Sequence, residues 1–160
     1  MECLPKILER LNQHQVEYVL VGGLAAVLHG VTLVTRDVDV CLPFTEENLA
    51  RLEKALVDLR PVHRMTPQRL PFVLEPGLAA RLKNLYLRTD LGVLDCIGEV
   101  AGIGDYAEVK RRSVVADLPV GSCRVLSIPA LIESKQTLNR AQDKLAVIQL
   151  RAILDKPAQP

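Results

Sequence analysis

Hydrophobic residues change their spacing several times within the first thirty positions. Over residues 4–14 they recur at helical intervals and predict an amphipathic helix. The apolar run over 18–21, with Val16 before it, predicts a short buried strand over 16–21. Residues 23–29 then predict a short helix that Gly30 closes. The chain is therefore expected to start as helix, strand and helix.

The next segment predicts a connection, a strand and a helix. We expect residues 32–35 to form an exposed connection and residues 36–42 to form a second strand, which Pro43 ends. Thr45 is placed to cap the following helix, and two glutamates are favourably placed in the first turn of that helix. The buried face of that helix is marked by Leu49, Leu52, Leu56 and Leu59.

The middle of the chain begins without any sustained period. Residues 61–76 hold four prolines and predict a long loop with one short strand near 72–74. Loops of this length often border a binding site. Two β-rich runs follow, at 84–89 and 93–97, and they predict a hairpin.

The last third predicts one more strand pair between helices. Residues 106–112 predict a short helix, and residues 113–118 and 123–128 predict two strands. Pro129 suits the first turn of the next helix. A final helix carries Leu145, Ile148 and Ala152.

Two carboxylates interrupt the strand predicted over 36–42. Side chains at i and i+2 of a strand lie on one face, so Asp37 and Asp39 point the same way, while Val38, Val40 and Leu42 point the other. Like charges about 4 Å apart repel by about 4 kcal/mol at a partly screened dielectric. A bound cation explains such a pair better than folding alone.

A glycine pair and a third carboxylate complete the polar pattern. Gly22 and Gly23 stand between the first strand and its helix, where free backbone N–H groups can meet an anion. Asp95 stands between apolar residues in the second strand of the hairpin, which favours a buried carboxylate with a ligand.

Composition limits the partners that the chain can take. Its 160 residues are 49% hydrophobic, which is enough for the core of one globular unit, and aromatic residues make up only 3%. Few aromatic platforms are therefore available to stack single-stranded bases. The formal net charge of +1 supplies no field for gripping a long nucleic acid, so no long nucleic acid is expected as a partner.

The cysteines and the apolar segments indicate the compartment. The four cysteines are dispersed and form no C-x-x-C pair, which argues against a zinc knuckle. No apolar run reaches the length of a membrane span, and no basic region precedes an apolar stretch at the N-terminus. We expect a cytoplasmic protein with free thiols and no membrane partner.

The order of these motifs resembles the nucleotidyltransferase superfamily, whose fold is shared with the palm of DNA polymerase beta. That family carries Gly-[Gly/Ser], then Asp-x-[Asp/Glu], then a carboxylate on a later strand, and these positions match Gly22-Gly23, Asp37, Asp39 and Asp95. The segments VGGLAAVLHG, TRDVDV, LRTDLGVLDCIG and SIPALIESKQTLNRAQDK look most like small AbiEii-type proteins, which are related to abortive-infection toxins.

The resemblance implies a fold and its extent. It implies an α+β minimal nucleotidyltransferase fold, with a mixed β-sheet and helices packed mainly on one face. Residues 1–156 would form this single domain, and residues 157–160 a frayed tail.

The resemblance also implies the site. Asp37, Asp39 and Asp95 would be the catalytic residues and would bind two Mg²⁺ ions, with Mn²⁺ as a substitute. Nucleotide binding would fall to four residues: Gly22, Gly23, Lys135 and Asp143. The chain has Gly23 where the commoner family form has serine, which removes one hydroxyl from the phosphate contact.

Two functions from different classes follow. The first is a metal-dependent nucleotidyltransferase that moves an NMP from an NTP to a hydroxyl of an RNA end, a protein or a small molecule and releases pyrophosphate. The second is a catalytically silent or antitoxin-controlled binding module of a toxin–antitoxin-like system, with an antitoxin protein as partner.

Each motif by itself also has a purely structural explanation. The glycine pair alone is most often a turn, and the Asp37-x-Asp39 pair alone would face solvent beside Arg36 or lysines. Asp95 alone suits a strand edge, and Lys135 belongs equally to a solvated helix face. The histidines at 14, 29 and 63 are expected to be structural. Cys41 is expected to be a small buried residue beneath the site. The order of the motifs is what favours the site.

Overall fold

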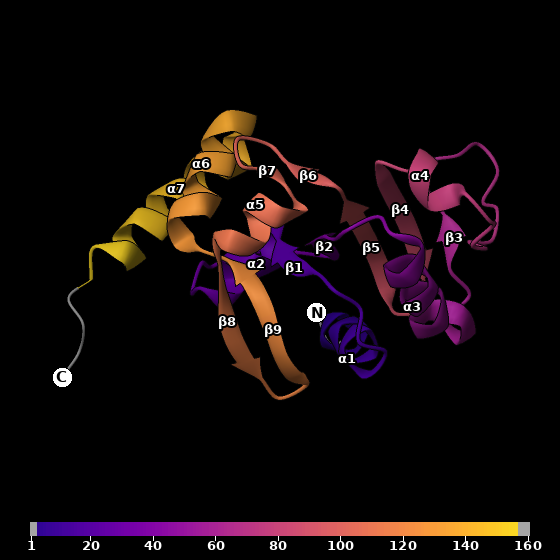
Figure 1. Ribbon diagram of the computed structural model, residues 1–160. Helices are drawn as coiled ribbons and strands as arrows, with labels where there is room; N and C mark the ends of the chain where they lie inside the picture. The colour runs from indigo at the N-terminus through magenta and orange to yellow at the C-terminus, as the bar shows by residue number, and fades with distance from the viewer. Residues whose placement is uncertain (1–2, 157–160) are drawn as a thin grey trace.

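The computed structural model describes residues 3–156 (Figure 1). Its helices are α1 (Leu4–Gln13), α2 (Gly22–Leu28), α3 (Glu46–Leu56), α4 (Leu78–Arg81), α5 (Tyr106–Arg111), α6 (Ile128–Leu138) and α7 (Ala141–Leu154), with a 3-10 turn η1 (Val57–Leu59). Its strands are β1 (Val19–Val21), β2 (Asp37–Cys41), β3 (Val62–His63), β4 (Asn84–Thr89), β5 (Gly92–Ile97), β6 (Glu99–Val100), β7 (Gly104–Asp105), β8 (Ser113–Leu118) and β9 (Gly121–Leu126).

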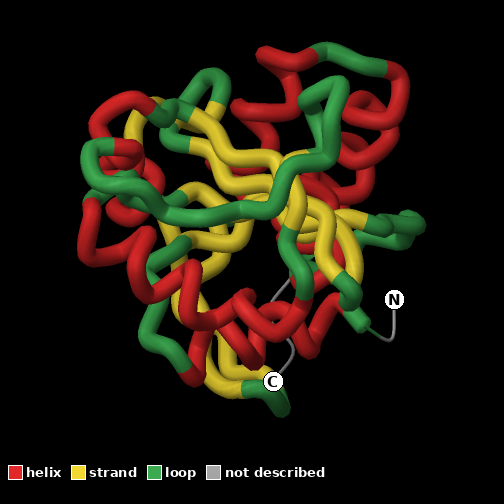
Figure 2. Tube along the Cα trace, turned by 90° about the vertical axis from the view of Figure 1, so that its right-hand side faces the viewer, coloured by secondary structure: helices red, strands yellow, loops and turns green. Residues whose placement is uncertain are grey.

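One mixed sheet organises the described residues, in the order β3-β4-β5-β2-β1-β9-β8. The β2–β5 and β1–β9 pairs are parallel and the other neighbours are antiparallel. Strands β6 and β7 form a separate small pair. Figure 2 shows the strands in the middle of the molecule with helices around them. The predicted α+β fold with a mixed sheet is confirmed.

Helices α1 and α3 supply much of the core. They contact each other, and α1 lies against β5, where Gly92 leaves room for Leu4 and Ile7. The leucines predicted to be buried on α3 are inaccessible to solvent at 49, 52 and 56. The helical spacing seen in the sequence therefore identifies the two apolar faces correctly.

Helices α6 and α7 lie against each other at the end of the molecule opposite to β3 and β4 (Figure 1). Ser127 caps α6, because its hydroxyl accepts a hydrogen bond from the Ala130 N–H at 3.4 Å. The strand before α6 therefore ends at Leu126, earlier than the expected 128. Helix α7 buries Ala146, Val147 and Leu150, whereas Leu145 and Ile148 are exposed.

Two expected segments differ from the structure. The strand predicted near 72–74 is wrong, because the strand in this loop is β3 at Val62–His63. Phe72 instead packs into the core, and its ring lies edge-on to the His63 ring at a centroid distance of 6.0 Å. The connection over 32–35 is not fully exposed, since Thr35 is buried. Tertiary contacts decide both differences.

Asn48, which is almost completely buried, links the residue that lies shortly before β1 to the residue that lies shortly after β2. Its side-chain amide donates to the carbonyls of Glu17 at 3.0 Å and Pro43 at 3.2 Å, and its Oδ1 accepts from the Glu17 N–H at 2.8 Å. Its own N–H donates to the Thr45 hydroxyl, which confirms the predicted cap. One side chain thus ties together both strands that carry the polar motifs.

Among the described residues, no helix is both long and apolar enough to cross a membrane. The tail predicted over 157–160 lies outside the described residues.

We expect Asn48→Ala to lower the free energy of unfolding by about 2–4 kcal/mol, because it removes three hydrogen bonds between the buried Asn48 amide and backbone groups of residues 17 and 43. Urea unfolding measures this change. Asn84→Ala, which removes the same amide from an exposed position, is the matched control and should change stability by less than about 0.5 kcal/mol. Equal losses in the two variants would contradict this role of Asn48.

Candidate active site

The turn between β1 and α2 requires a glycine. Strand β1 passes directly into α2 at Gly22, whose φ is +68°. A Cβ atom at Gly22 would lie 2.4 Å from Oδ2 of Asp39, which is too close for any side chain. The backbone of Gly22 is therefore in direct contact with the carboxylate strand, as the motif order predicts.

Strand pairing places the carboxylates side by side. Asp39 is the register partner of Val21 on one side and of Asp95 on the other. Asp37 lies two residues before Asp39 on the same face, while Val38 and Val40 are buried on the opposite face. The structure thus brings together the three aspartates that the sequence singled out. Asp95 is only 8% exposed.

This arrangement is electrostatically costly. Burial, followed by the charges of Asp95 and Asp37, raises the pKa of Asp39 to about 6 from 3.8. Arg64 and Lys135 act in the opposite direction and favour the ionised form of Asp39. Burial and the two neighbouring carboxylates outweigh the two cations, so ionised Asp39 is disfavoured at this position.

Arg64 is a component of the site that the sequence analysis missed. Its Nε donates to Oδ1 of Asp95 at 2.9 Å and its Nη2 donates to Oδ2, so the guanidinium grips the carboxylate with two parallel hydrogen bonds. Its Cζ lies 5.3 Å from the ring centroid of Tyr86. Arg64 follows β3 in a proline-rich loop, and no local pattern connects it to a residue 31 positions away.

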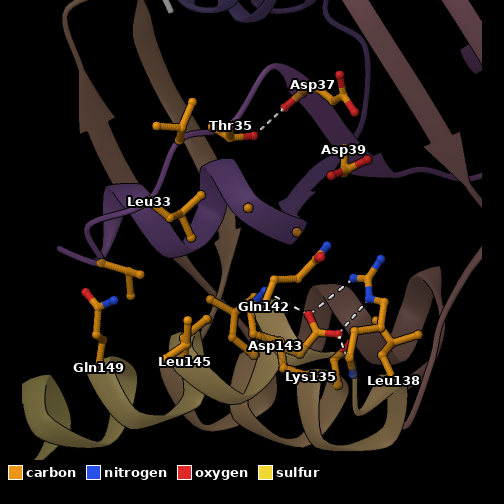
Figure 3. A pocket seen from close by; sticks show the side chains of 18 of the residues that line it. Leu33, Thr35, Asp37, Asp39, Lys135, Leu138, Gln142, Asp143, Leu145 and Gln149 are labelled. Carbon is orange, nitrogen blue, oxygen red and sulfur yellow. Dashed lines mark hydrogen bonds and ion pairs between the residues drawn. The ribbon is translucent and has the colours of Figure 1, made fainter.

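A cavity of about 600 Å³ opens beside the carboxylates (Figure 3). Asp37 and Asp39 lie on one wall, and α6 and α7 form the other. Besides apolar side chains, its lining consists of Gly22, Gly23, Thr32, Thr35, Arg36, Asp37, Asp39, Asp95, Ser134, Lys135, Arg140, Gln142, Asp143 and Gln149. All seven residues predicted for the site line this one cavity.

The wall opposite the carboxylates carries two cations held by one buried aspartate. Asp143 is 1% exposed, and it accepts from Nε of Arg140 at 2.6 Å and from Nη2 at 3.2 Å. Nζ of Lys135 lies 3.7 Å from Asp143. Although burial opposes it, hydrogen bonding from Arg140 lowers the pKa of Asp143. Asp143 therefore stays ionised and orients Lys135 and Arg140 at the cavity.

The third wall is the connection 31–36, which includes the residues 32–35 that were expected to be exposed. The Thr35 hydroxyl donates to the carbonyl of Asp37 at 3.2 Å, and a Cβ atom at Gly23 would lie 3.1 Å from that hydroxyl. Gln149 of α7 accepts from the Thr32 N–H at 2.8 Å and donates to the Thr32 carbonyl at 3.3 Å. These contacts hold the connection as a wall between α2 and α7.

The remaining sequence candidates occupy structural positions. Nε2 of His29 lies 2.8 Å from the carbonyl of Leu126, and the His63 ring packs on Phe72. Cys41 is completely buried, and burial raises the pKa of its thiol to about 12. Such a thiol is a poor nucleophile.

The donor atoms suit a hard divalent cation, although they do not form a closed cage. Carboxylate oxygens are the ligands that Mg²⁺ prefers, and a cation would relieve the repulsion that raises the pKa of Asp39. Within residues 3–156, no three histidine, cysteine or acidic side chains are grouped closely enough to hold a metal ion as they stand. Asp37 and Asp39 are the part that fits, and Asp95 is held by Arg64.

The sequence matches no model of a known protein family and no curated protein. Solved structures do match. The chain is similar to the lincosamide antibiotic adenylyltransferase LnuA in its lincomycin-bound form, with a TM-score of 0.61, 18% identity and coverage of 95% of this chain and 96% of that chain.

Two further solved structures of similar fold match the chain. A putative nucleotidyltransferase from Thermotoga maritima, TM1012, has a TM-score of 0.58 at 19% identity, covering 98% of this chain and 92% of that chain. The antibiotic-resistance factor ANT(2'')-Ia in solution has a TM-score of 0.54 at 18% identity, covering 96% and 89%. The chain therefore has the fold of the nucleotidyltransferases.

Proposed function

We propose that this protein transfers an NMP from an NTP to a hydroxyl acceptor, with pyrophosphate as the leaving group. The observation that carries the proposal is the cavity itself, in which three carboxylates on neighbouring strands face two cations across a glycine-lined opening. LnuA is an adenylyltransferase and TM1012 a putative nucleotidyltransferase, which supports the same reaction class.

The donor NTP binds in the cavity. Its phosphates approach the backbone at Gly22 and Gly23, which line the cavity and carry no side chain of their own. Lys135 and Arg140 neutralise the phosphates from the opposite wall, and Asp143 contributes to nucleotide binding by orienting both cations. The Thr35 hydroxyl, next to Gly23, is placed to supply the contact that a serine at position 23 would make.

The carboxylates act at the reacting phosphorus. Asp37, Asp39 and Asp95 are the residues that would hold divalent cations, Mg²⁺ or Mn²⁺, whose charge offsets that of the triphosphate. The acceptor oxygen forms a bond to the α-phosphorus, the bond from that phosphorus to the bridging oxygen breaks, and pyrophosphate leaves with the electron pair. The acceptor proton passes to an oxygen of Asp95, next to β4, which uses one lone pair for Arg64 and keeps the other for the proton.

The alternative is a silent or antitoxin-controlled module, and one observation favours it. Arg64 occupies both oxygens of Asp95, so the third carboxylate is engaged in the structure. A relationship to AbiEii-type proteins, with an antitoxin as partner, belongs to this alternative and rests on sequence motifs alone. Nucleotide binding and turnover distinguish the two functions.

Isothermal calorimetry with each Mg²⁺-NTP tests the donor site directly. We expect the wild type to bind at least one NTP, and Asp37→Asn with Asp39→Asn to weaken binding by at least about 100-fold, because two charge-assisted contacts are lost. Asp155→Asn, an exposed carboxylate after α7, should bind like the wild type.

Turnover is measured by incubating the wild type with α-labelled NTP, Mg²⁺ and a cell extract. Label that appears on an extract component, and disappears with the double variant, supports the transferase. A folded wild type that binds nucleotide without any label transfer favours the controlled module. A folded wild type that binds no nucleotide overturns the proposed function.

The pKa of Asp39 predicts a pH-dependent stability in the absence of metal. The folded protein keeps a proton on Asp39 up to about pH 6, whereas the unfolded chain loses it near pH 3.8, so stability falls as pH rises through this window. The loss amounts to about 3 kcal/mol for a shift of about two units.

Urea unfolding in chelator from about pH 4.5 to about pH 7.5 checks this dependence. Asp39→Asn should flatten the fall and should be more stable than the wild type at the upper end, although it loses a metal ligand. A parallel pH dependence in the two proteins would contradict the raised pKa.

Gly22→Ala should lower nucleotide affinity by at least about tenfold and stability by about 2–3 kcal/mol, since its Cβ would meet Asp39 at 2.4 Å and its φ is positive. Gly77→Ala is the matched control. Gly77 has φ +80° with open space around a Cβ, so it carries the backbone cost alone, about 1 kcal/mol. Equal effects in the two variants would show that the close approach to Asp39 has no role.

A further inference from the structure

The proposed function fixes the side from which the acceptor arrives. The donor cavity lies between the carboxylates and α6 and α7, on the β1 side of β2. In-line displacement requires the attacking oxygen to lie opposite the leaving pyrophosphate. The acceptor must then approach from the other side of the carboxylates, where β5, β4 and β3 continue the sheet.

Strand register shows which side chains that surface presents. Tyr86 is the partner of Asp95, and the Arg64 N–H donates to the Tyr86 carbonyl at 3.1 Å, so the row through Asp39 and Asp95 continues to Tyr86 and Arg64. Cross-strand partners share a face. One row further, Arg88 pairs with Val93, and Val93 pairs with Asp37.

We call this surface the acceptor face: Val62, Arg64, Asn84, Tyr86, Arg88, Val93 and Ile97. The alternate residues of β4, Leu85 and Leu87, are buried against the core on the other side. Arg88 and Asn84 are exposed, and the other five are half-buried. The acceptor face is therefore open next to Asp95.

The acceptor face carries two arginines, of which Arg64 is paired with Asp95 while Arg88 is exposed. Arg64 and Arg88 are its ionisable residues besides the tyrosine, and the neighbouring carboxylates are the three aspartates of the site itself. The grip on Asp95 uses two of the five N–H donors of a guanidinium, so Arg64 keeps donors for a further acceptor atom. Its position over the Tyr86 ring fixes the plane of the guanidinium.

We propose that the acceptor is a hydroxyl compound with an anionic group, a phosphate or a carboxylate, which Arg88 and the remaining donors of Arg64 bind while its hydroxyl faces Asp95. The apolar part of the acceptor lies along Tyr86 and Val93. A cationic acceptor would be repelled by Arg88 and could pair only with the site carboxylates, which would hold the divalent cations. The proposal deepens the function proposed above and depends on it.

Three compounds with one carbon skeleton test the charge requirement: glycerol, glycerate and glycerol 3-phosphate. Each is titrated into ¹⁵N-labelled protein in which a non-transferable Mg²⁺-NTP analogue fills the cavity. We expect the two anions to shift the amide resonances of Tyr86 and Arg88, and glycerol to leave them unchanged. The anion that binds with the higher affinity shows whether the acceptor face prefers a carboxylate or a phosphate.

Arg88→Gln should weaken anion binding by about fivefold, the effect of losing one partly exposed ion pair. Arg51→Gln removes an exposed arginine from α3, on the other face of the sheet, and should have no effect. Equal shifts with glycerol, or unchanged anion affinity in Arg88→Gln, would each overturn the proposal.

The same spectra separate this proposal from the proposed function. The resonances of Gly22 and Gly23 report the nucleotide analogue, and those of Tyr86 and Arg88 report the acceptor. An analogue without effect at the glycines refutes the donor site, whereas anions without effect at the acceptor face refute only the acceptor class.

Discussion

The parallel pairing of β2 with β5 is the constraint on which the site depends. It makes Asp39 and Asp95 register partners, and neighbouring strands lie only about 5 Å apart. Burial, together with repulsion between carboxylates at that spacing, raises the pKa of Asp39 to about 6. The opposite face of β2 is apolar and buried, and its packing holds the strand in place despite this repulsion.

Cationic side chains lie near these carboxylates on two sides. On the cavity side, Asp143 holds Lys135 and Arg140 opposite the carboxylates. On the sheet side, Arg64 grips Asp95 directly and rests on Tyr86. The two sides differ in shape, since one is a closed-in cavity and the other an open strand surface. In the reaction proposed above, the cavity would hold the donor and the strand surface the acceptor.

Backbone features hold this geometry with little tolerance. Gly22 approaches Asp39 so closely that a side chain cannot be added, and Asn48 ties the start of β1 to the end of β2 through its buried amide. Gln149 holds the connection 31–36 against α7. The donor cavity therefore depends on contacts from three separate elements.

Local pattern by itself determined most of the elements and the position of the three carboxylates. Period-two alternation placed Asp37 and Asp39 on one face, and helical spacing identified the buried leucines of α1 and α3, because both signals lie within a few residues. The glycine pair and Asp95 were found in the same way, from their immediate neighbours. The subfamily and the acceptor were not within reach of these patterns.

Only the tertiary structure decided which charges meet. Arg64 and Asp95 are 31 residues apart, and Gln149 and Thr32 are 117 apart. It also moved β3 to Val62–His63, since pairing with β4 outweighed the weak local preference of residues 72–74. The sequence therefore specified the carboxylates, whereas their cations, the cavity walls and the open acceptor face depend on contacts between distant segments.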